Sequence, residues 1–296
     1  MHTMKVGVVD VGSNTVRLLI AASSGSGIER VREDRAYVGL GAEILEHGFV
    51  RSERIEHAAE TVRRFARLAR KGGVAHLDIF VTAPGRQAAN ADELVDGLAR
   101  AAREPVHVLS AEEEAAFAYR GAVAALAKVE GAVAVCDVGG GSTEIAIGAP
   151  PSAAAWVRSL DLGSLRLTAA LLPSDPPTAA ELAAAEEAVA APLAPILPPR
   201  PAVALAVGGS ARAVARLVGP RFGEPELTLA VRLTTERRSA KVAKAYGIDE
   251  ERARVLPAGA LILRGVTRRL GVPFDLGRGG VREGAAAALA AELRAA

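Results

Sequence analysis

One pattern occurs twice in this 296-residue chain, and it restricts the fold more than any other feature of the sequence. The stretch KVGVVDVGSNTVRLLI covers residues 5–20, and AVAVCDVGGGSTEIAI covers residues 132–147. In both, a β-branched run ends in Asp-Val-Gly, small or polar residues follow, and an apolar run then resumes. This order predicts a β-hairpin with a glycine-containing turn rather than a strand followed by a helix. Two similar hairpins in one chain predict two similar domains.

Helix and strand signals alternate after each hairpin. Ser110 and Glu113 form one capping box at a predicted helix start, and Thr178 and Glu181 form another. Strands that alternate with helices indicate the α/β class with mixed sheets. The expected helices cover 52–71, 88–102, a segment from 111 onward, 179–191, 208–217, 235–245, 258–270 and 281–295; the expected strands outside the hairpins cover 77–82, 106–109, 157–160 and 202–207.

Composition excludes several classes of protein. Half of the residues (50%) are hydrophobic and 24% are charged, which suits a folded chain with a sizeable core. Aromatic residues make up only 3% and no dense basic cluster occurs, so no nucleic-acid partner is expected. The basic residues are nearly all arginine, which suits phosphate binding but also follows from genome composition.

The lone cysteine and the short lengths of the apolar runs indicate the cellular compartment. Cys136 lies in the apolar run VAVCDV, so we expect a small core residue rather than a nucleophile, and no intramolecular disulfide. The N-terminus lacks the apolar run of a signal peptide, and no uninterrupted apolar run reaches 18 residues. We therefore expect a soluble, cytoplasmic protein without a membrane partner.

The two predicted turns suggest anion binding. Gly12-Ser13-Asn14 and 139–142 offer successive backbone N–H groups with no bulky side chain beside them, a pattern that binds phosphate. Asp10 and Asp137 lie two residues before these turns, and carboxylates beside phosphate imply a hard cation such as Mg²⁺. The alternative is a pair of ordinary hairpins in which each aspartate caps its own turn.

Three glutamates at a predicted helix start are candidates for acid–base chemistry. The capping box explains Glu113, which leaves Glu112 and Glu114 as carboxylates that could orient and deprotonate a water molecule. Their spacing does not choose between them.

An ordered set of motifs resembles the exopolyphosphatase/guanosine pentaphosphate phosphohydrolase (Ppx/GppA) family. The set spans nearly the whole chain, and its order makes it far more specific than the motif DVGGGST alone. The matching segments are DVGSNTVRLL (10–19), TAPGRQAAN (82–90), SAEEEAAFAYRG (110–121), DVGGGSTE (137–144), SLDLGSLRLT (159–168), AVGGSARAVA (206–215), GIDEERARVLPAGALIL (247–263) and GGVREG (279–284).

The resemblance implies a fold and an activity. The fold is two ribonuclease H-like domains of the actin-like superfamily, which includes acetate and sugar kinases and heat-shock ATPases, around an interdomain cleft. The first domain would cover 1–124, with the helix 281–296 packing back on it, and the second would cover 125–280. The activity is metal-dependent removal of a terminal phosphate from inorganic polyphosphate or pppGpp by water. A homodimer is compatible with the resemblance.

The resemblance also assigns roles to residues. Glu114 is the catalytic glutamate, while Asp10, Asp137 and Glu144 bind Mg²⁺, with Mn²⁺ as the alternative ion. Arg86 and Arg252 match family arginines that line the cleft, although either could be an ordinary surface or ion-pair arginine. The phosphate-binding candidates are Gly12, Ser13, Asn14, Arg17, Arg86, Gly139, Gly140, Gly141, Ser142, Gly208, Gly209, Ser210 and Arg252.

Departures from the family pattern bear on the substrate. Thr82-Ala83-Pro84-Gly85-Arg86 replaces T-S-A-x-R and loses a hydroxyl, and Arg254 replaces a frequent aspartate. Arg254 would either tighten substrate binding or form an ion pair. The C-terminal helical domain of long family members is not expected here, which favours short-chain polyphosphate.

Two other functions stay open. An ATP-using phosphotransferase of the same superfamily could place a nucleotide at the helix start of residues 208–210. A non-catalytic sensor would bind polyphosphate or a guanosine alarmone without turning it over.

Overall fold

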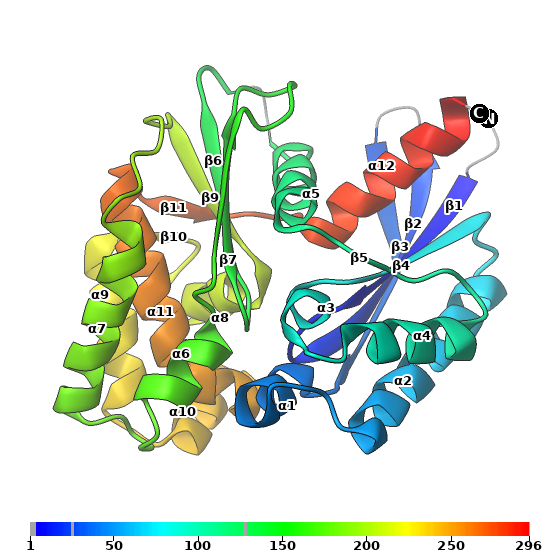
Figure 1. Cartoon of the computed structure of the whole chain (residues 1–296). Helices are drawn as coiled ribbons and strands as arrows, with labels where there is room; N and C mark the ends of the chain where they lie inside the picture. Colours follow the sequence, from blue (N-terminus) through cyan, green and yellow to red (C-terminus); the bar gives the residue numbers. More distant parts are fainter. Residues whose placement is uncertain (1–3, 25–26, 127–128, 296) are drawn as a thin grey trace. The chain divides into compact units, whose positions relative to one another are not determined.

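The structure is a computed structural model that describes residues 4–24, 27–126 and 129–295 (Figure 1). The chain divides into two compact units, of which the first contains residues 1–124 and 281–296 and the second contains residues 125–280. Each unit is built on one mixed β-sheet with helices packed on it, so the predicted α/β class is confirmed.

The first unit contains a five-stranded sheet in the order β3-β2-β1-β4-β5. Its elements are β1 (Met4–Val11), β2 (Thr15–Ser24), β3 (Gly27–Tyr37), α1 (Leu40–His47), α2 (Ser52–Lys71), β4 (His76–Val81), α3 (Ala83–Gln87), α4 (Ala91–Ala102), β5 (His107–Val108), α5 (Ala111–Val123) and α12 (Val281–Ala295). The predicted hairpin is β1 and β2, which pair antiparallel, and β4 pairs parallel with β1.

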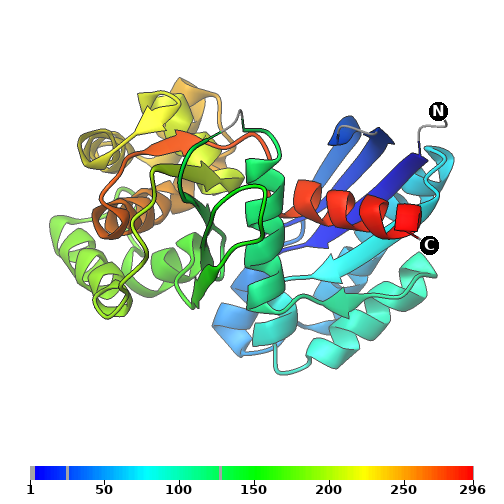
Figure 2. The ribbon, with the colours of Figure 1, turned by 90° about the horizontal axis from the view of Figure 1, so that it is seen from above.

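Helices cover both faces of the first sheet. On one face, Val62 and Phe65 of α2 share a core with Val9 of β1. On the other face, α12 lies across β1, β2 and β3 (Figure 2) and packs against α5. Gly284 of α12 comes so near to α5 that a Cβ atom there would lie 1.9 Å from the carbonyl oxygen of Phe117.

The second unit contains a six-stranded sheet in the order β10-β11-β9-β6-β7-β8. Its elements are β6 (Val133–Val138), β7 (Thr143–Gly148), β8 (Trp156–Leu160), α6 (Ser164–Leu171), α7 (Ala179–Leu193), β9 (Val203–Val207), α8 (Gly208–Val218), β10 (Arg221–Phe222), α9 (Glu224–Thr235), α10 (Ser239–Tyr246), α11 (Glu250–Leu270) and β11 (Phe274–Leu276). Cys136 is fully buried in the core of this unit, as predicted.

The two sheets repeat one topology. The series β8-β7-β6-β9-β11 has the same sequence of antiparallel and parallel pairings as β3-β2-β1-β4-β5, and β10 is added at the edge. The repeated sequence pattern of the hairpins therefore belongs to a repeat that extends through each whole sheet.

Several elements differ from the predictions. The helix expected over 258–270 begins at Glu250, because α11 continues through Pro257. The helix expected over 235–245 is α10, over Ser239–Tyr246, and the one expected over 88–102 begins at Ala91. Seven further elements have no counterpart among the predicted ones: β3, β10, β11, α1, α3, α6 and α9.

None of the described helices combines the length and the apolar character that a membrane crossing requires.

Candidate functional site

The turn between β1 and β2 is held by the segment that leads into α1. The carbonyl oxygen of Ser13 accepts a hydrogen bond from the N–H of Gly41 at 2.7 Å. The carbonyl oxygen of Asn14 accepts from the N–H groups of Val38 and Gly39 at 2.9 and 3.2 Å. The position of this first turn therefore depends on where the start of α1 lies.

The turn between β6 and β7 is held in the same way by the start of α6. The carbonyl oxygen of Gly139 accepts from the N–H of Ser164 at 2.9 Å. The carbonyl oxygen of Gly140 accepts from the N–H groups of Leu165 and Arg166 at 3.0 and 3.1 Å. Each predicted phosphate turn thus has a short helix behind it, and neither helix was predicted.

Gly163 allows α6 to come this near to the second turn. A Cβ atom at Gly163 would lie 2.2 Å from the carbonyl oxygen of Gly140, so a larger residue would force the turn and the helix apart. This glycine lies within the motif SLDLGSLRLT and had no predicted role. The local indication of its role is that it directly precedes Ser164, where a helix begins that was not predicted.

Both turns share an electrostatic property. Their carbonyl oxygens point toward N–H groups at a helix start, so the negative ends of those peptide dipoles face the helix. The positive ends of the same peptide groups then face the opposite side, which favours an anion there. This arrangement suits the phosphate role predicted for Asn14, Gly140 and Gly141, whose N–H groups belong to these peptide groups. The N–H groups of Gly12 and Gly139 instead donate to the carbonyl oxygens of Thr15 and Ser142 within the turns.

Each hairpin carries a charged pair next to its turn. Asp10 of β1 is the cross-strand partner of Arg17 of β2, and Asp137 of β6 is the partner of Glu144 of β7. Cross-strand partners place their side chains on one face of a sheet. The first hairpin therefore joins a carboxylate with a guanidinium, while the second brings two carboxylates together.

The two carboxylates of the second unit lie in tight surroundings. Glu144 is 2% exposed and accepts a hydrogen bond from the hydroxyl of Ser159 on β8 at 3.0 Å. Gly208 at the start of α8 has a φ of 82°, and a Cβ atom there would lie 2.1 Å from Oδ1 of Asp137. Glycine at this place therefore lets the end of β6 and the start of α8 approach each other.

The donor set of the second hairpin fits a magnesium ion. Mg²⁺ prefers oxygen ligands and is usually held by one or two carboxylates, water and substrate phosphates rather than by a full protein cage. Asp137 and Glu144 supply two carboxylates beside a glycine-rich turn. Within residues 4–24, 27–126 and 129–295, no group of three or more histidine, cysteine, aspartate or glutamate side chains forms a candidate metal cage.

Glu114 is held by Arg86. The guanidinium Nη2 of Arg86 donates to Oε2 of Glu114 at 2.9 Å, and its Nη1 donates to the carbonyl oxygen of Leu109 at 2.8 Å. The side chains are 21% and 13% exposed, so the ion pair is partly shielded from water. Arg86 therefore forms an ion pair, and its partner is the predicted catalytic glutamate.

The other two glutamates of the run have separate places. Glu113 accepts from the N–H of Ser110 at 2.8 Å, and its own N–H donates to the Ser110 hydroxyl, so the predicted capping box is confirmed. These hydrogen bonds hold the pKa of the Glu113 carboxyl below its ordinary value. Glu112 is exposed.

The start of α8 carries three predicted phosphate-binding residues. A Cβ atom at Gly209 would lie 2.6 Å from Nη2 of Arg252, so the absence of a side chain gives this arginine access to the helix start. Ser210 is 1% exposed and its hydroxyl donates to the carbonyl oxygen of Val138 at 3.0 Å. The Ser210 hydroxyl therefore anchors α8 to β6, and a phosphate contact from this residue would have to use its backbone N–H.

Arg254 donates hydrogen bonds to backbone carbonyl groups of its own unit. Its Nη2 donates to the carbonyl oxygens of Leu172 and Pro173, at 2.5 and 2.9 Å. Leu172 is the C-cap residue of α6, so this arginine satisfies carbonyl groups at the C-terminus of that helix.

Thr82 is a residue of the first unit that sequence reasoning passed over. Its N–H donates to the carbonyl oxygen of Val11 at 3.1 Å, and its hydroxyl oxygen would lie 3.8 Å from a Cβ atom at Gly12. The hydroxyl that remains in the altered TAPGR motif therefore lies beside the first turn.

Comparison with known proteins gives consistent matches over most of the chain. The profile of the Ppx/GppA phosphatase family matches residues 19–291. Exopolyphosphatase 1 of Mycobacterium leprae (strain TN) is 27% identical over 299 residues, which cover 95% of this chain and 88% of that protein. The guanosine-5'-triphosphate,3'-diphosphate pyrophosphatase of Vibrio vulnificus (strain YJ016) is 28% identical over 297 residues, which cover 97% of this chain and 59% of that protein.

A solved structure shows the same fold. The crystal structure of the Aquifex aeolicus member of the Ppx/GppA protein family has a TM-score of 0.84 to this chain at 25% sequence identity. The match covers 99% of both chains.

Proposed function

Because the chain belongs to the Ppx/GppA phosphatase family, we propose that it is a metal-dependent exopolyphosphatase. Its substrate is short-chain inorganic polyphosphate, with pppGpp as a second substrate. The names of the two relatives support a phosphoanhydride hydrolase. The observation that carries the proposal is the pair of glycine-containing turns, each held from behind by the start of a short helix.

In the proposed reaction, water attacks the terminal phosphorus of the chain. Glu114 takes a proton from this water, the new P–O bond forms, and the bond to the bridging oxygen breaks. Orthophosphate leaves, the chain is one phosphate shorter, and the proton returns to solvent. Arg86 keeps the Glu114 carboxylate in one orientation and is itself fixed by the Leu109 carbonyl.

The remaining roles follow from charge and from backbone geometry. We assign phosphate binding to the two turns and to Arg17 and Arg252, since guanidinium groups and exposed peptide N–H groups both suit phosphate oxygens. We assign Mg²⁺, or Mn²⁺ in its place, to Asp137 and Glu144 of the second unit. For the first unit we assign a metal-binding role to Asp10. When bound, this ion neutralises charge on phosphate oxygens.

The test is release of orthophosphate in the presence of Mg²⁺ from four substrates: short-chain polyphosphate, long-chain polyphosphate, pppGpp and ATP. We expect the fastest release from short-chain polyphosphate. Chelation by EDTA should abolish release, and added Mg²⁺ should restore it. Release that EDTA leaves unchanged would contradict the metal assignment.

Two variants of one helix test the catalytic glutamate. Glu114→Gln should lower kcat by about 10²–10⁴-fold, which is the usual contribution of a general base, while short-chain polyphosphate still binds. Glu112→Gln is the matched control, because it removes the same charge from an exposed place on the same helix. Equal activity of the two variants would reject the role of Glu114.

Other results of this assay would favour the rival functions. Formation of ADP from ATP only when a small-molecule acceptor is added would indicate a phosphotransferase. Tight binding of polyphosphate or pppGpp without any release of phosphate would indicate a sensor.

A further inference from the structure

We propose that Glu43 is a positioning residue for the first phosphate turn. It acts through α1, whose start holds the carbonyl oxygens of that turn, and it has no assigned contact with substrate. The inference rests on the proposed function for its kinetic consequence, but its structural part can be measured without any activity.

The first turn depends on α1 for its position. The hydrogen bonds to the Ser13 and Asn14 carbonyls come from residues directly before and within the start of α1. Any shift of this helix would move the donors Val38, Gly39 and Gly41, and the turn would lose these hydrogen bonds.

The helix α1 has little intrinsic stability. It has only eight residues, its N-cap makes no side-chain hydrogen bond, and Gly39 and Gly48 flank it in the left-handed conformation. A helix of this length is unstable in water by itself, so tertiary contacts must hold it.

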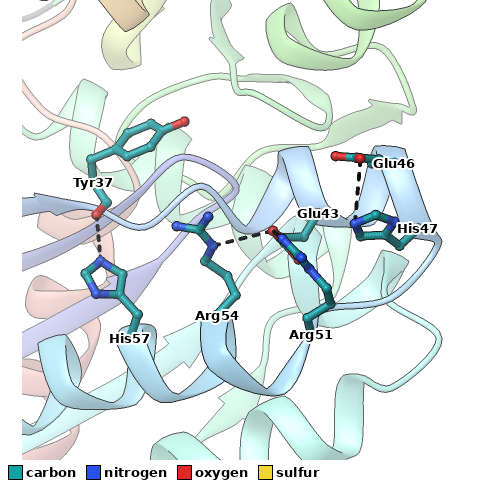
Figure 3. Close-up of polar contacts among 7 residues, drawn as sticks. All are labelled: Tyr37, Glu43, Glu46, His47, Arg51, Arg54 and His57. Atoms are coloured by element: carbon teal, nitrogen blue, oxygen red, sulfur yellow. Dashed lines mark hydrogen bonds and ion pairs between the residues drawn. The ribbon is translucent and has the colours of Figure 1, made fainter.

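The contact that holds α1 is made by Glu43. Glu43 is 4% exposed, and both of its carboxylate oxygens accept hydrogen bonds at 2.7 Å from the guanidinium of Arg51, which precedes α2. Nε of Arg54 on α2 lies 3.6 Å from Oε1 of the same carboxylate. Figure 3 shows both arginines reaching from the start of α2 to Glu43. This Glu43 cluster (Glu43, Arg51 and Arg54) ties α1 to the 20-residue helix α2.

The flanking segments are tied to the same region. His57 of α2 lies 3.3 Å, through Nε2, from the carbonyl oxygen of Tyr37, at the end of β3 (Figure 3). The side chain of Asn90 bonds both the N–H and the carbonyl of Val50, at 2.9 and 2.8 Å. The chain before and after α1 is therefore fixed, and Glu43 supplies the buried charged contact within the helix.

The charge state of Glu43 agrees with this role. Hydrogen bonding to Arg51 is the main cause that lowers the pKa of the Glu43 carboxyl to about 2. The carboxylate is therefore ionised at neutral pH and can hold both arginines.

The test compares two buried glutamates of the first unit. Glu43→Gln keeps the shape of the side chain but replaces one acceptor oxygen with an amide that repels the guanidinium. Glu283→Gln is the control, because Glu283 pairs with Arg30 at 2.9 Å, is also largely buried (8% exposed), and fixes α12 to β3. Neither residue belongs to the proposed catalytic or binding machinery.

The first readout is amide hydrogen exchange, which needs no activity. In Glu43→Gln we expect the N–H groups of Val38, Gly39 and Gly41 to exchange about tenfold faster, since local opening of α1 becomes easier. In Glu283→Gln these amides should exchange as in the unmodified protein. Unchanged exchange in Glu43→Gln, or equal acceleration in both variants, would overturn the inference.

The second readout is the separation of KM from kcat on short-chain polyphosphate. We expect Glu43→Gln to raise KM about tenfold with a smaller change in kcat, because a displaced turn weakens phosphate binding before the chemical step. Arg51→Gln should raise KM by a similar factor. The double variant should raise KM no further than either single variant, since both changes remove the same Glu43–Arg51 contact. Additive effects would argue against the Glu43–Arg51 contact as the cause.

The two readouts separate the inference from the proposed function. If the unmodified protein releases no phosphate from any substrate, the proposed function fails, and the exchange measurement still decides the role of Glu43. If phosphate is released but KM in Glu43→Gln is unchanged, the positioning role fails while the proposed function stands.

Discussion

At Gly163 the absence of a side chain determines how closely α6 approaches the second turn. The space that a Cβ atom would need is taken by the Gly140 carbonyl oxygen, only 2.2 Å away. A backbone atom cannot rotate aside as a long side chain can, so the turn itself would have to move.

Gly163→Ala should therefore reduce phosphate release and lower the free energy of unfolding by about 1–3 kcal/mol, as overpacked sites generally do. Gly223→Ala is the control, because a Cβ atom there meets its nearest neighbour at an ordinary 3.4 Å. Chemical denaturation and the phosphate assay measure both variants. Equal stability and activity of Gly163→Ala and the unmodified protein would show that the turn shifts to make room for the Cβ atom at little cost in free energy.

Cys136 gives a second prediction at this scale. The thiol is fully buried in the core of the second unit, and burial raises its pKa well above the ordinary value. We expect a thiol reagent to leave the native protein unlabelled at neutral pH and to label the denatured chain fully. Rapid labelling of the native protein would contradict the packing around β6.

Among the elements, α1 and α6 have equivalent tasks but different anchors. The buried Glu43 cluster holds α1 to α2. The helix α6 is held by Arg254 at its C-terminal carbonyls and by the Ser164 hydroxyl, which donates to the Gly139 carbonyl. Only the first of these anchors contains a carboxylate, so the two turns should differ in their sensitivity to acid.

The stability of the first unit should depend on pH through Glu43. Its pKa is about 2 in the folded protein, against an ordinary value of 4.5, so its contribution to stability is complete above about pH 4.5. As the pH falls from about 4.5 to about 2, the folded state loses this advantage.

Glu43→Gln should consequently be less stable than the unmodified protein at pH 7, and the difference should shrink as the pH falls toward about 2. Denaturant unfolding at several pH values measures this. Glu46→Gln, an exposed change on the same helix, is the control. A difference that stays constant with pH would show that charge on Glu43 does not stabilise α1.

The sequence predicted some elements well for physical reasons. Both hairpins were found because their strands are apolar runs, and the Ser110 and Thr178 helices were found because a capping box is local. The strand β3 was missed because it is exposed along most of its length and has no apolar alternation. The contacts of Gly163 and Glu43 depend on residues distant in sequence or on an unpredicted helix, so no local sequence pattern predicts them.

For the whole molecule, the course of the chain gives a further prediction. The first unit is assembled from residues 1–124 and the helix α12, whereas the second unit is one continuous stretch, 125–280. Residues such as Ala285 and Ala288 of α12 are buried within the first unit.

A fragment of residues 125–280 should therefore fold alone, while a fragment of residues 1–124 should need the peptide 281–296 in the same solution. Circular dichroism and thermal unfolding of each fragment, with and without the peptide, test this. A fragment 1–124 that unfolds at the same temperature in both conditions would show that α12 adds no stability.

The closeness of Gly284 to Phe117 has a consequence for synthesis on the ribosome. The helix α5 is translated long before α12, and at about 5–20 residues per second the stretch between them takes roughly 10–30 s to make. During that interval the surface of α5 that receives α12 has not yet met its partner. The second unit can therefore finish folding before the first unit, although synthesis of the first unit begins earlier.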